Sequence, residues 1–123
     1  MANAINWFEI PVKNFNKAKS FYEAVLGSEM QLMEAMGMKS AFFAADLQNG
    51  SIGGSIIQGE GYEPSEKGAV VYLNGGDDLN VPLAKVEQAG GKVVLPKTAI
   101  GENGFMAYFL DTEGNKVGLH SRN

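Results

Sequence analysis

The chain contains a single histidine, His120, and its imidazole is the group best suited to exchange protons near neutral pH. It lies in an alternating segment, residues 116–121, that is typical of a β-strand. The alternation puts His120 and Gly118 on one face and the apolar Val117 and Leu119 on the other. A glycine within a strand leaves the backbone open to close approach, so we expect this face to meet a ligand.

A carboxylate occupies a comparable place in the first predicted strand, residues 6–12. Trp7 and Glu9 share one face of that strand, whereas Phe8 and Ile10 share the other. A glutamate can act as a general base beside a carbonyl, and a histidine can donate to the oxyanion that develops. The chain has no cysteine, which removes thiolate nucleophiles, thiolate metal ligands and disulfides.

Composition predicts one folded domain and argues against several classes of partner. The 123 residues are 45% hydrophobic, enough to bury a core. The net charge is −4 and no basic stripe is visible, which argues against nucleic-acid binding. No apolar run approaches the roughly 20 residues of a membrane helix, and no signal peptide is indicated. We therefore expect a cytoplasmic protein that binds no membrane.

The first half of the chain predicts one strand, one helix and three more strands. Asn14 or Asn16 can cap the helix, which carries apolar residues at helical spacing and ends at Gly27. Asn49-Gly50 predicts a hairpin turn before the last strand. The three further strands are expected at residues 28–35, 39–46 and 51–58.

The same order returns after residues 59–68, a polar segment punctuated by Gly and Pro that predicts a linker. Asn80 can cap the second helix, with Pro82 in its first turn, and Gly90-Gly91 ends it. The chain closes on a hairpin, residues 105–121, with a polar turn at Asp111–Asn115. The other expected pieces are a strand at 69–74, a loop at 75–78, a strand at 92–95 and a loop at 96–104.

The two halves also share residues. Glu23 and Gly27 recur in the second half as Glu87 and Gly91, with the same spacing between them. Asp46 and Gly53 recur in the same way as Asp111 and Gly118. A repeat of this length indicates duplication of a supersecondary unit that needs a partner to bury its sheet face.

Three segments together resemble the vicinal oxygen chelate superfamily, which includes glyoxalase I, bleomycin-resistance proteins and extradiol dioxygenases. They are INWFEIPVKNFNKAKSFYEAVLG at 5–27, AGGKV at 89–93 and FLDTEGNKVGL at 109–119. The resemblance implies an α+β fold of two tandem βαβββ modules, whose curled, cup-like mixed sheet holds a small molecule and has the helices outside. It implies a single domain over residues 1–123, with module one at about 5–58, the linker at 59–68 and module two at about 69–122. It also implies a homodimer, because members this short usually dimerise.

The resemblance implies a metal site in the catalytic members, with one His or Glu on the first and last strand of each module. In this sequence those positions fall on Trp7, Gly53, Gly118 and one of residues 69–71. None of these side chains can coordinate a metal ion. We therefore expect neither a metal nor another cofactor.

The residues two steps further along the same faces are the polar groups we expect in the cup: Glu9, Ser55, Tyr72 and His120. Trp7 would form an aromatic wall, and Gly53 and Gly118 would expose backbone to a ligand. Ser55 lies in no nucleophile-elbow motif. The leading hypothesis is a metal-independent small-molecule-binding protein. The alternatives are a metal-free lyase or isomerase, with Glu9 as general base and His120 as acid or oxyanion donor, and a purely structural or protein-interaction role.

Overall fold

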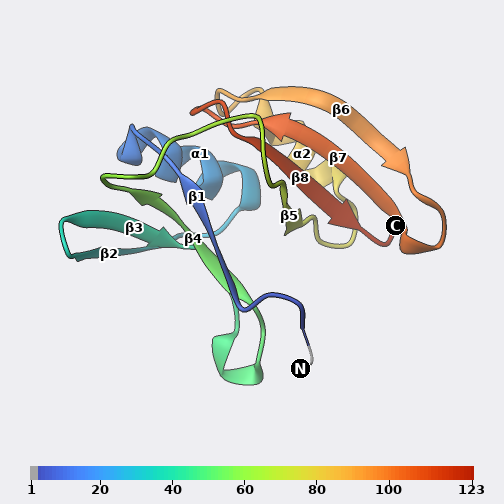
Figure 1. The fold of residues 1–123 in the computed structure, drawn as a ribbon. Coiled ribbons are helices and arrows are strands. Elements are labelled where there is room, and N and C mark those ends of the chain that lie inside the picture. The colour runs from blue at the N-terminus through green and yellow to red at the C-terminus, as the bar shows by residue number, and fades with distance from the viewer. Residues whose placement is uncertain (1–2) are drawn as a thin grey trace.

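The computed structural model describes residues 3–123, which form two four-stranded mixed sheets and two helices (Figure 1). One sheet has the strand order β1-β4-β3-β2 and the other β5-β8-β7-β6. The elements are β1 (Trp7–Pro11), α1 (Phe15–Leu26), β2 (Gln31–Ala35), β3 (Met38–Phe42), the 3₁₀ turn η1 (Leu47–Asn49), β4 (Gly53–Gln58), β5 (Val71–Asn74), α2 (Asn80–Val86), β6 (Lys92–Ala99), the 3₁₀ turn η2 (Gly101–Asn103), β7 (Phe105–Leu110) and β8 (Lys116–Ser121). The predicted α+β fold of two βαβββ modules is confirmed, with sheets that curl but do not close. Residues 1 and 2 of the predicted domain lie outside the described part.

The duplication is visible in the pairing of the strands. In each module the first strand runs parallel to the last, β1 beside β4 and β5 beside β8. Trp7 lies opposite Gly53 in the first pair, and Tyr72 lies opposite Gly118 in the second. Trp7 and Tyr72 are therefore equivalent residues of the two modules.

Helix α1 joins the two modules. Its N-terminus is capped by Asn14, whose side chain accepts a hydrogen bond from the Lys17 N–H (3.3 Å). It ends at Gly27, which has a left-handed φ of 72° and donates its N–H to the Glu23 carbonyl. Tyr22 of the buried face packs edge-on against Phe43, just after β3 (5.3 Å between ring centroids), and also reaches Phe109 of β7 (6.5 Å). One helix thus contributes to the core on both sheets.

Each sheet buries one face against the helices and leaves the other free of them. Ile10 and Ile56 of the first sheet and Phe109 and Leu119 of the second belong to the buried core. Because strand side chains alternate, the neighbours of these residues lie on the opposite faces. Trp7, Glu9, Tyr72 and His120 lie outside the buried core cluster, on these opposite faces.

The second helix begins differently from the prediction. Asn80 is its first residue rather than its cap, and the Asp78 carboxylate accepts the Asn80 N–H at 2.9 Å. Pro82 is the third residue and still lies in the first turn, where its missing N–H has no helical partner to lose.

The strands on either side of Asn49-Gly50, β3 and β4, pair antiparallel, but the prediction that this dipeptide forms the hairpin turn itself is wrong. That dipeptide closes the turn η1, where the Asn49 amide and the Asn49 and Ser51 N–H groups all bond to Asp46. The tight hairpin lies instead at Met36-Gly37, between β2 and β3, with φ values of 55° and 75°. Two successive positive φ values are what a type I′ hairpin requires, and a methionine at the first one gives no sequence signal.

The strand predicted at 92–95 continues to Ala99, so the loop expected from Pro96 begins later. β6 is an edge strand, and its pairing with β7 shifts register on both sides of Leu95, the residue before Pro96. A proline is tolerated there because no neighbouring strand needs its N–H. Within residues 3–123, no helix is both long and apolar enough to cross a bilayer.

Candidate functional site

In the first sheet, the ring of Trp7 lies over Gly53. A Cβ added to Gly53 would come within 3.1 Å of the Trp7 ring and 2.9 Å of the Leu47 side chain, so these two groups fill the space a side chain would need. The indole also meets Phe42 edge-on, with 5.4 Å between ring centroids. Trp7 remains 39% exposed, so this aromatic pair forms an accessible apolar surface.

In the second sheet, Tyr72 covers Gly118 in the same way. A Cβ on Gly118 would come within 2.5 Å of the Tyr72 ring. The Tyr72 hydroxyl lies 2.5 Å from the Tyr108 hydroxyl, and this hydrogen bond together with partial burial raises the pKa of Tyr72 to about 12. The Lys116 ammonium lies 5.1 Å from the centre of the Tyr108 ring.

These pairs correct the expected register of the second module. Because Tyr72 lies opposite Gly118, Tyr72 itself occupies the position equivalent to Trp7, not one of residues 69–71. Asn74, opposite His120, is then the equivalent of Glu9. The four positions at which the resemblance implies metal ligands therefore carry two aromatic rings and two glycines.

This donor set does not fit a divalent ion. Indole and glycine offer no ligand atom, and the Tyr72 hydroxyl is engaged by Tyr108. Within the described residues, no group of three or more His, Asp or Glu side chains is placed to hold a metal. The rings also replace the bare backbone expected at Gly53 and Gly118, because both glycines are buried beneath them.

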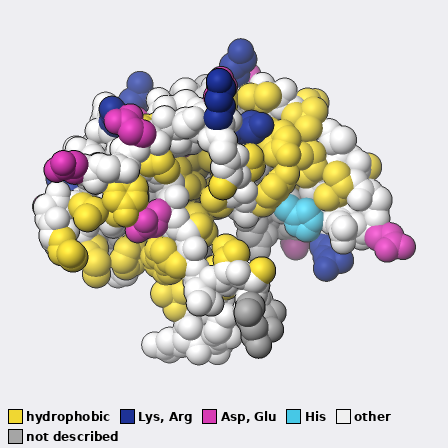
Figure 2. Space-filling model, in the orientation of Figure 1, with side chains coloured by type: hydrophobic (Ala, Val, Ile, Leu, Met, Phe, Trp, Pro, Cys, Tyr) yellow, Lys and Arg dark blue, Asp and Glu magenta, His cyan; other side chains and the backbone are white. Residues whose placement is uncertain are grey.

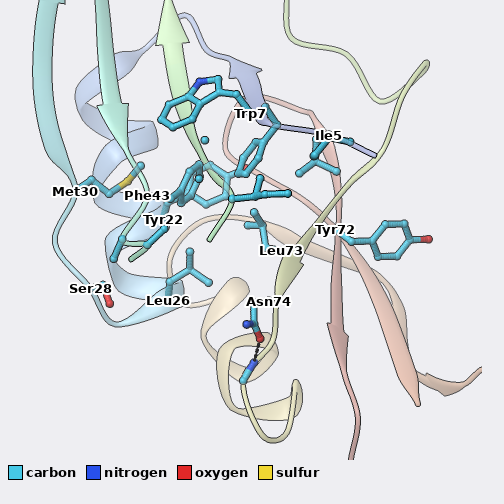
Figure 3. A pocket seen from close by; sticks show the side chains of 18 of the residues that line it. Ile5, Trp7, Tyr22, Leu26, Ser28, Met30, Phe43, Tyr72, Leu73 and Asn74 are labelled. Atoms are coloured by element: carbon cyan, nitrogen blue, oxygen red, sulfur yellow. Dashed lines mark hydrogen bonds between the residues drawn. The ribbon is translucent and has the colours of Figure 1, made fainter. Parts of the chain in front are cut away.

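A pocket of about 930 Å³, here called the Trp7 pocket, opens between β1 and β5 (Figure 3). Trp7, Gly53 and Tyr72 all line it. Figure 3 shows the Tyr72 ring pointing away from Trp7, so the two rings do not face one another across the pocket. Met30 lines it as well, and sequence reasoning missed much of the other apolar lining, which includes Leu26, Phe43 and Leu73.

His120 lines a second pocket, of about 850 Å³, here called the His120 pocket. Its Nε2 lies 2.6 Å from the Asn103 carbonyl oxygen. Tyr72 lines this pocket as well, so one tyrosine borders both. Sequence reasoning missed Asn74, Met106, Tyr108 and Arg122, which also line it. The hairpin register would have found Tyr108, since it lies opposite Gly118.

Glu9 lies apart from both pockets. Its carboxylate accepts a hydrogen bond from the Tyr62 hydroxyl (2.9 Å), and it lines a separate pocket of about 210 Å³ together with Lys116. Ser55 lies opposite Glu9 in the strand pair and is almost fully buried. In the part of the chain that the structure describes, Glu9 and His120 therefore line different pockets.

A family model described as the glyoxalase/bleomycin resistance protein/dioxygenase superfamily matches residues 4–119. Two curated relatives, from Mycobacterium bovis and Mycobacterium tuberculosis, are named CFP32 and carry a provisional glyoxylase description. Each is 28% identical over 123 residues, which is 96% of this chain and 45% of the relative. This chain thus spans less than half the length of the curated relatives it matches.

Solved structures show the same fold. A glyoxalase/bleomycin resistance protein from Albidiferax ferrireducens has a TM-score of 0.72 at 16% identity, covering 98% of this chain and 100% of that one. A family enzyme from Burkholderia phytofirmans has a TM-score of 0.70 at 14% identity, with 96% and 98% covered. Glyoxalase I from Zea mays has a TM-score of 0.65 at 18% identity, with 94% of this chain and 45% of that one covered. The chain belongs to the glyoxalase/bleomycin resistance protein/dioxygenase superfamily.

Proposed function

We propose that this protein binds a small, partly aromatic molecule without a metal ion or other cofactor. The observation that carries the proposal is the aromatic ring over glycine at the equivalent position of both modules, Trp7 over Gly53 and Tyr72 over Gly118. These pairs remove the groups that would hold a metal and present aromatic surface in their place. Because aromatic rings stand where metal ligands would be needed, we infer a binding role without metal chemistry.

The two pockets beside the rings support binding rather than a purely structural role. Their volumes, about 930 and 850 Å³, lie within the range of small-molecule sites, and their lining is mostly apolar with a few polar groups. A structural role would be better served by a surface without hollows of this size. Trp7 and Tyr72, on the walls, suit a flat apolar ligand.

The proposal includes a homodimer that completes the site. The Trp7 and Tyr72 rings belong to different sheets and point apart in Figure 3. A second copy with two-fold symmetry could place the Trp7 face of one chain opposite the Tyr72 face of the other. A cytoplasmic location stays a proposal that composition alone supports.

The lyase alternative has less support. Proton abstraction by Glu9 with donation by His120 needs both groups within reach of one substrate. In one chain they line separate pockets, so this chemistry would require a partner chain to bring them together.

A thermal-shift screen tests the binding function. Protein treated with a chelator is heated with a library of aromatic compounds, and ligands of the folded state raise Tm. We expect hits whose shift is unchanged when Zn²⁺, Mn²⁺ or Fe²⁺ is added, and whose binding alters the fluorescence of the single tryptophan, Trp7. Shifts that appear only with added metal would contradict the proposal, as would the absence of any hit.

A further inference from the structure

The charged side chains that line the His120 pocket are unusual for an acidic protein. The chain has 14 acidic residues and a net charge of −4, yet among residues 3–123 no Asp or Glu side chain lines this pocket. It is lined instead by His120 and Arg122, the only histidine and the only arginine of the sequence. Figure 2 shows the histidine, in cyan, at the surface beside hydrophobic side chains. A pocket that excludes carboxylates and collects these two groups suits an anionic ligand.

The hydrogen bond between His120 and Asn103 determines which imidazole nitrogen of the neutral ring carries the proton. A carbonyl oxygen can only accept, so Nε2 of His120 carries a proton and donates it to the Asn103 carbonyl (2.6 Å). The second nitrogen, Nδ1, makes no hydrogen bond within the described residues. It is therefore the ring nitrogen that remains to contact a ligand.

The tyrosine pair supplies a further donor. When one hydroxyl of Tyr72 and Tyr108 donates to the other across 2.5 Å, the accepting hydroxyl keeps its own proton available. Tyr72, whose pKa is raised to about 12, is protonated at neutral pH, as a tyrosine ordinarily is. Gly118 is what brings the pair together, because both tyrosines lie opposite it on adjacent strands.

Much of the remaining lining is apolar, and the polar Asn74 and Ser121 complete it. Met106 is nearly buried, Ile100 is partly exposed, and the rings of Tyr72 and Tyr108 stand beside them. A methionine adapts to irregular ligand shapes, and the rings suit a flat body. The pocket thus combines a polar edge rich in donors with an apolar floor.

We propose that the His120 pocket binds the carboxylate end of an aromatic monocarboxylate, an inference that rests on the proposed binding function. Arg122 pairs with the carboxylate, since a guanidinium matches its two oxygens. His120 and the tyrosine hydroxyls flank that group, and the aromatic body lies on Met106. One arginine and one imidazole match a single negative charge better than a polyphosphate.

The test compares 1-naphthoate with 1-naphthamide, a neutral molecule of nearly the same shape, on untagged protein. The C2 proton of the single histidine gives one NMR signal for the His120 pocket, and Trp7 fluorescence reports the other pocket. We expect naphthoate to shift the histidine signal and to bind at least about tenfold more tightly than naphthamide, the order expected for one charge-assisted contact.

Arg122→Gln should remove that preference by weakening naphthoate binding far more than naphthamide binding. Lys17→Gln is the matched control, since it makes the same change in net charge at an exposed position of α1. Equal affinities for the two probes, or naphthoate binding that leaves the histidine signal in place, would overturn the carboxylate assignment while the proposed binding function stands. Binding of neither probe would count against both.

Discussion

Gly118 and Tyr72 act as a matched pair, because the ring occupies the volume that a larger residue at 118 would need. Gly118 is not in a left-handed conformation, so its backbone geometry would accept any residue. The requirement comes from the neighbouring ring alone. At Gly53 the space is shared, because an added Cβ would lie 3.1 Å from the Trp7 ring and 2.9 Å from the Leu47 side chain.

Gly118→Ala should therefore destabilise the protein through the ring. The new Cβ would lie 2.5 Å from Tyr72 Cδ2, so the ring must move and its hydroxyl must leave Tyr108. We expect a loss of about 1 to 3 kcal/mol in the free energy of unfolding, measured by urea denaturation.

The control is the same substitution in a Tyr72→Ala background. With the ring gone, the alanine should be neutral or slightly stabilising, because it restricts the unfolded chain more than glycine does. An equal loss in both backgrounds would show that some contact other than Tyr72 decides the residue at 118.

At the scale of elements, the turn between β7 and β8 is fastened to α1 by a buried carboxylate. Asp111 accepts hydrogen bonds from the Glu113 and Asn115 N–H groups and from the Asn115 side-chain amide. It also accepts the Tyr22 hydroxyl of α1 at 2.6 Å. Burial of Tyr22, followed by the nearby Asp111 charge, raises the pKa of Tyr22 well above its usual value.

Stability should fall at high pH because of Tyr22. In the unfolded chain Tyr22 loses its proton near pH 10, whereas the folded protein holds it to higher pH. Above that pH the unfolded state binds fewer protons, so the free energy of unfolding decreases as pH rises. Below about pH 9 this contribution is fully present.

Tyr22→Phe should lower stability by about 1 to 3 kcal/mol at neutral pH and flatten the decline between about pH 9 and 11. Urea denaturation across that range measures both effects. Tyr62→Phe is the matched control, since the Tyr62 hydroxyl donates to Glu9 at the exposed surface, and we expect little change there at neutral pH. If the free energy of unfolding of Tyr22→Phe declines with pH as much as that of the wild type, Tyr22 is not the source of the decline.

The elements show what the sequence could and could not predict. Helix α1 was predictable because its signals are local: Asn14 caps it and Gly27 ends it. The Met36-Gly37 hairpin was not, since pairing of β2 with β3 holds Met36 in a positive-φ conformation that its residue type does not favour. The sequence predicts a loop from Pro96 because sequence alone does not reveal that β6 is an edge strand.

For the molecule as a whole, the sequence predicts which strand face carries each site residue, but it does not predict which of these residues share a pocket. Alternation along each strand puts Glu9 and His120 on the faces away from the core. Which residues share a pocket depends on how the two sheets are placed through α1, a relation between distant segments that no local pattern encodes. That placement puts Glu9 and His120 in separate pockets.

A complete binding site could form within one chain or between two chains. Complementation between two damaged copies distinguishes these arrangements. Trp7→Ala removes the aromatic wall of one sheet, and Tyr72→Ala removes that of the other. If the site forms between the Trp7 face of one chain and the Tyr72 face of its partner, each variant alone has two damaged sites. A mixed dimer has one site with both defects and one with neither.

Mixing the two variants after unfolding and refolding together should therefore restore about a quarter of the wild-type binding sites, since half of the dimers are mixed and each has one intact site. Isothermal titration with the tightest compound from the thermal-shift screen counts the sites, and each variant refolded alone is the control. If the site closes within a single chain, every copy stays damaged and mixing restores nothing. Sedimentation analysis of the same samples separates that outcome from a failure to dimerise, because a chain of 13.2 kDa would then sediment as a monomer.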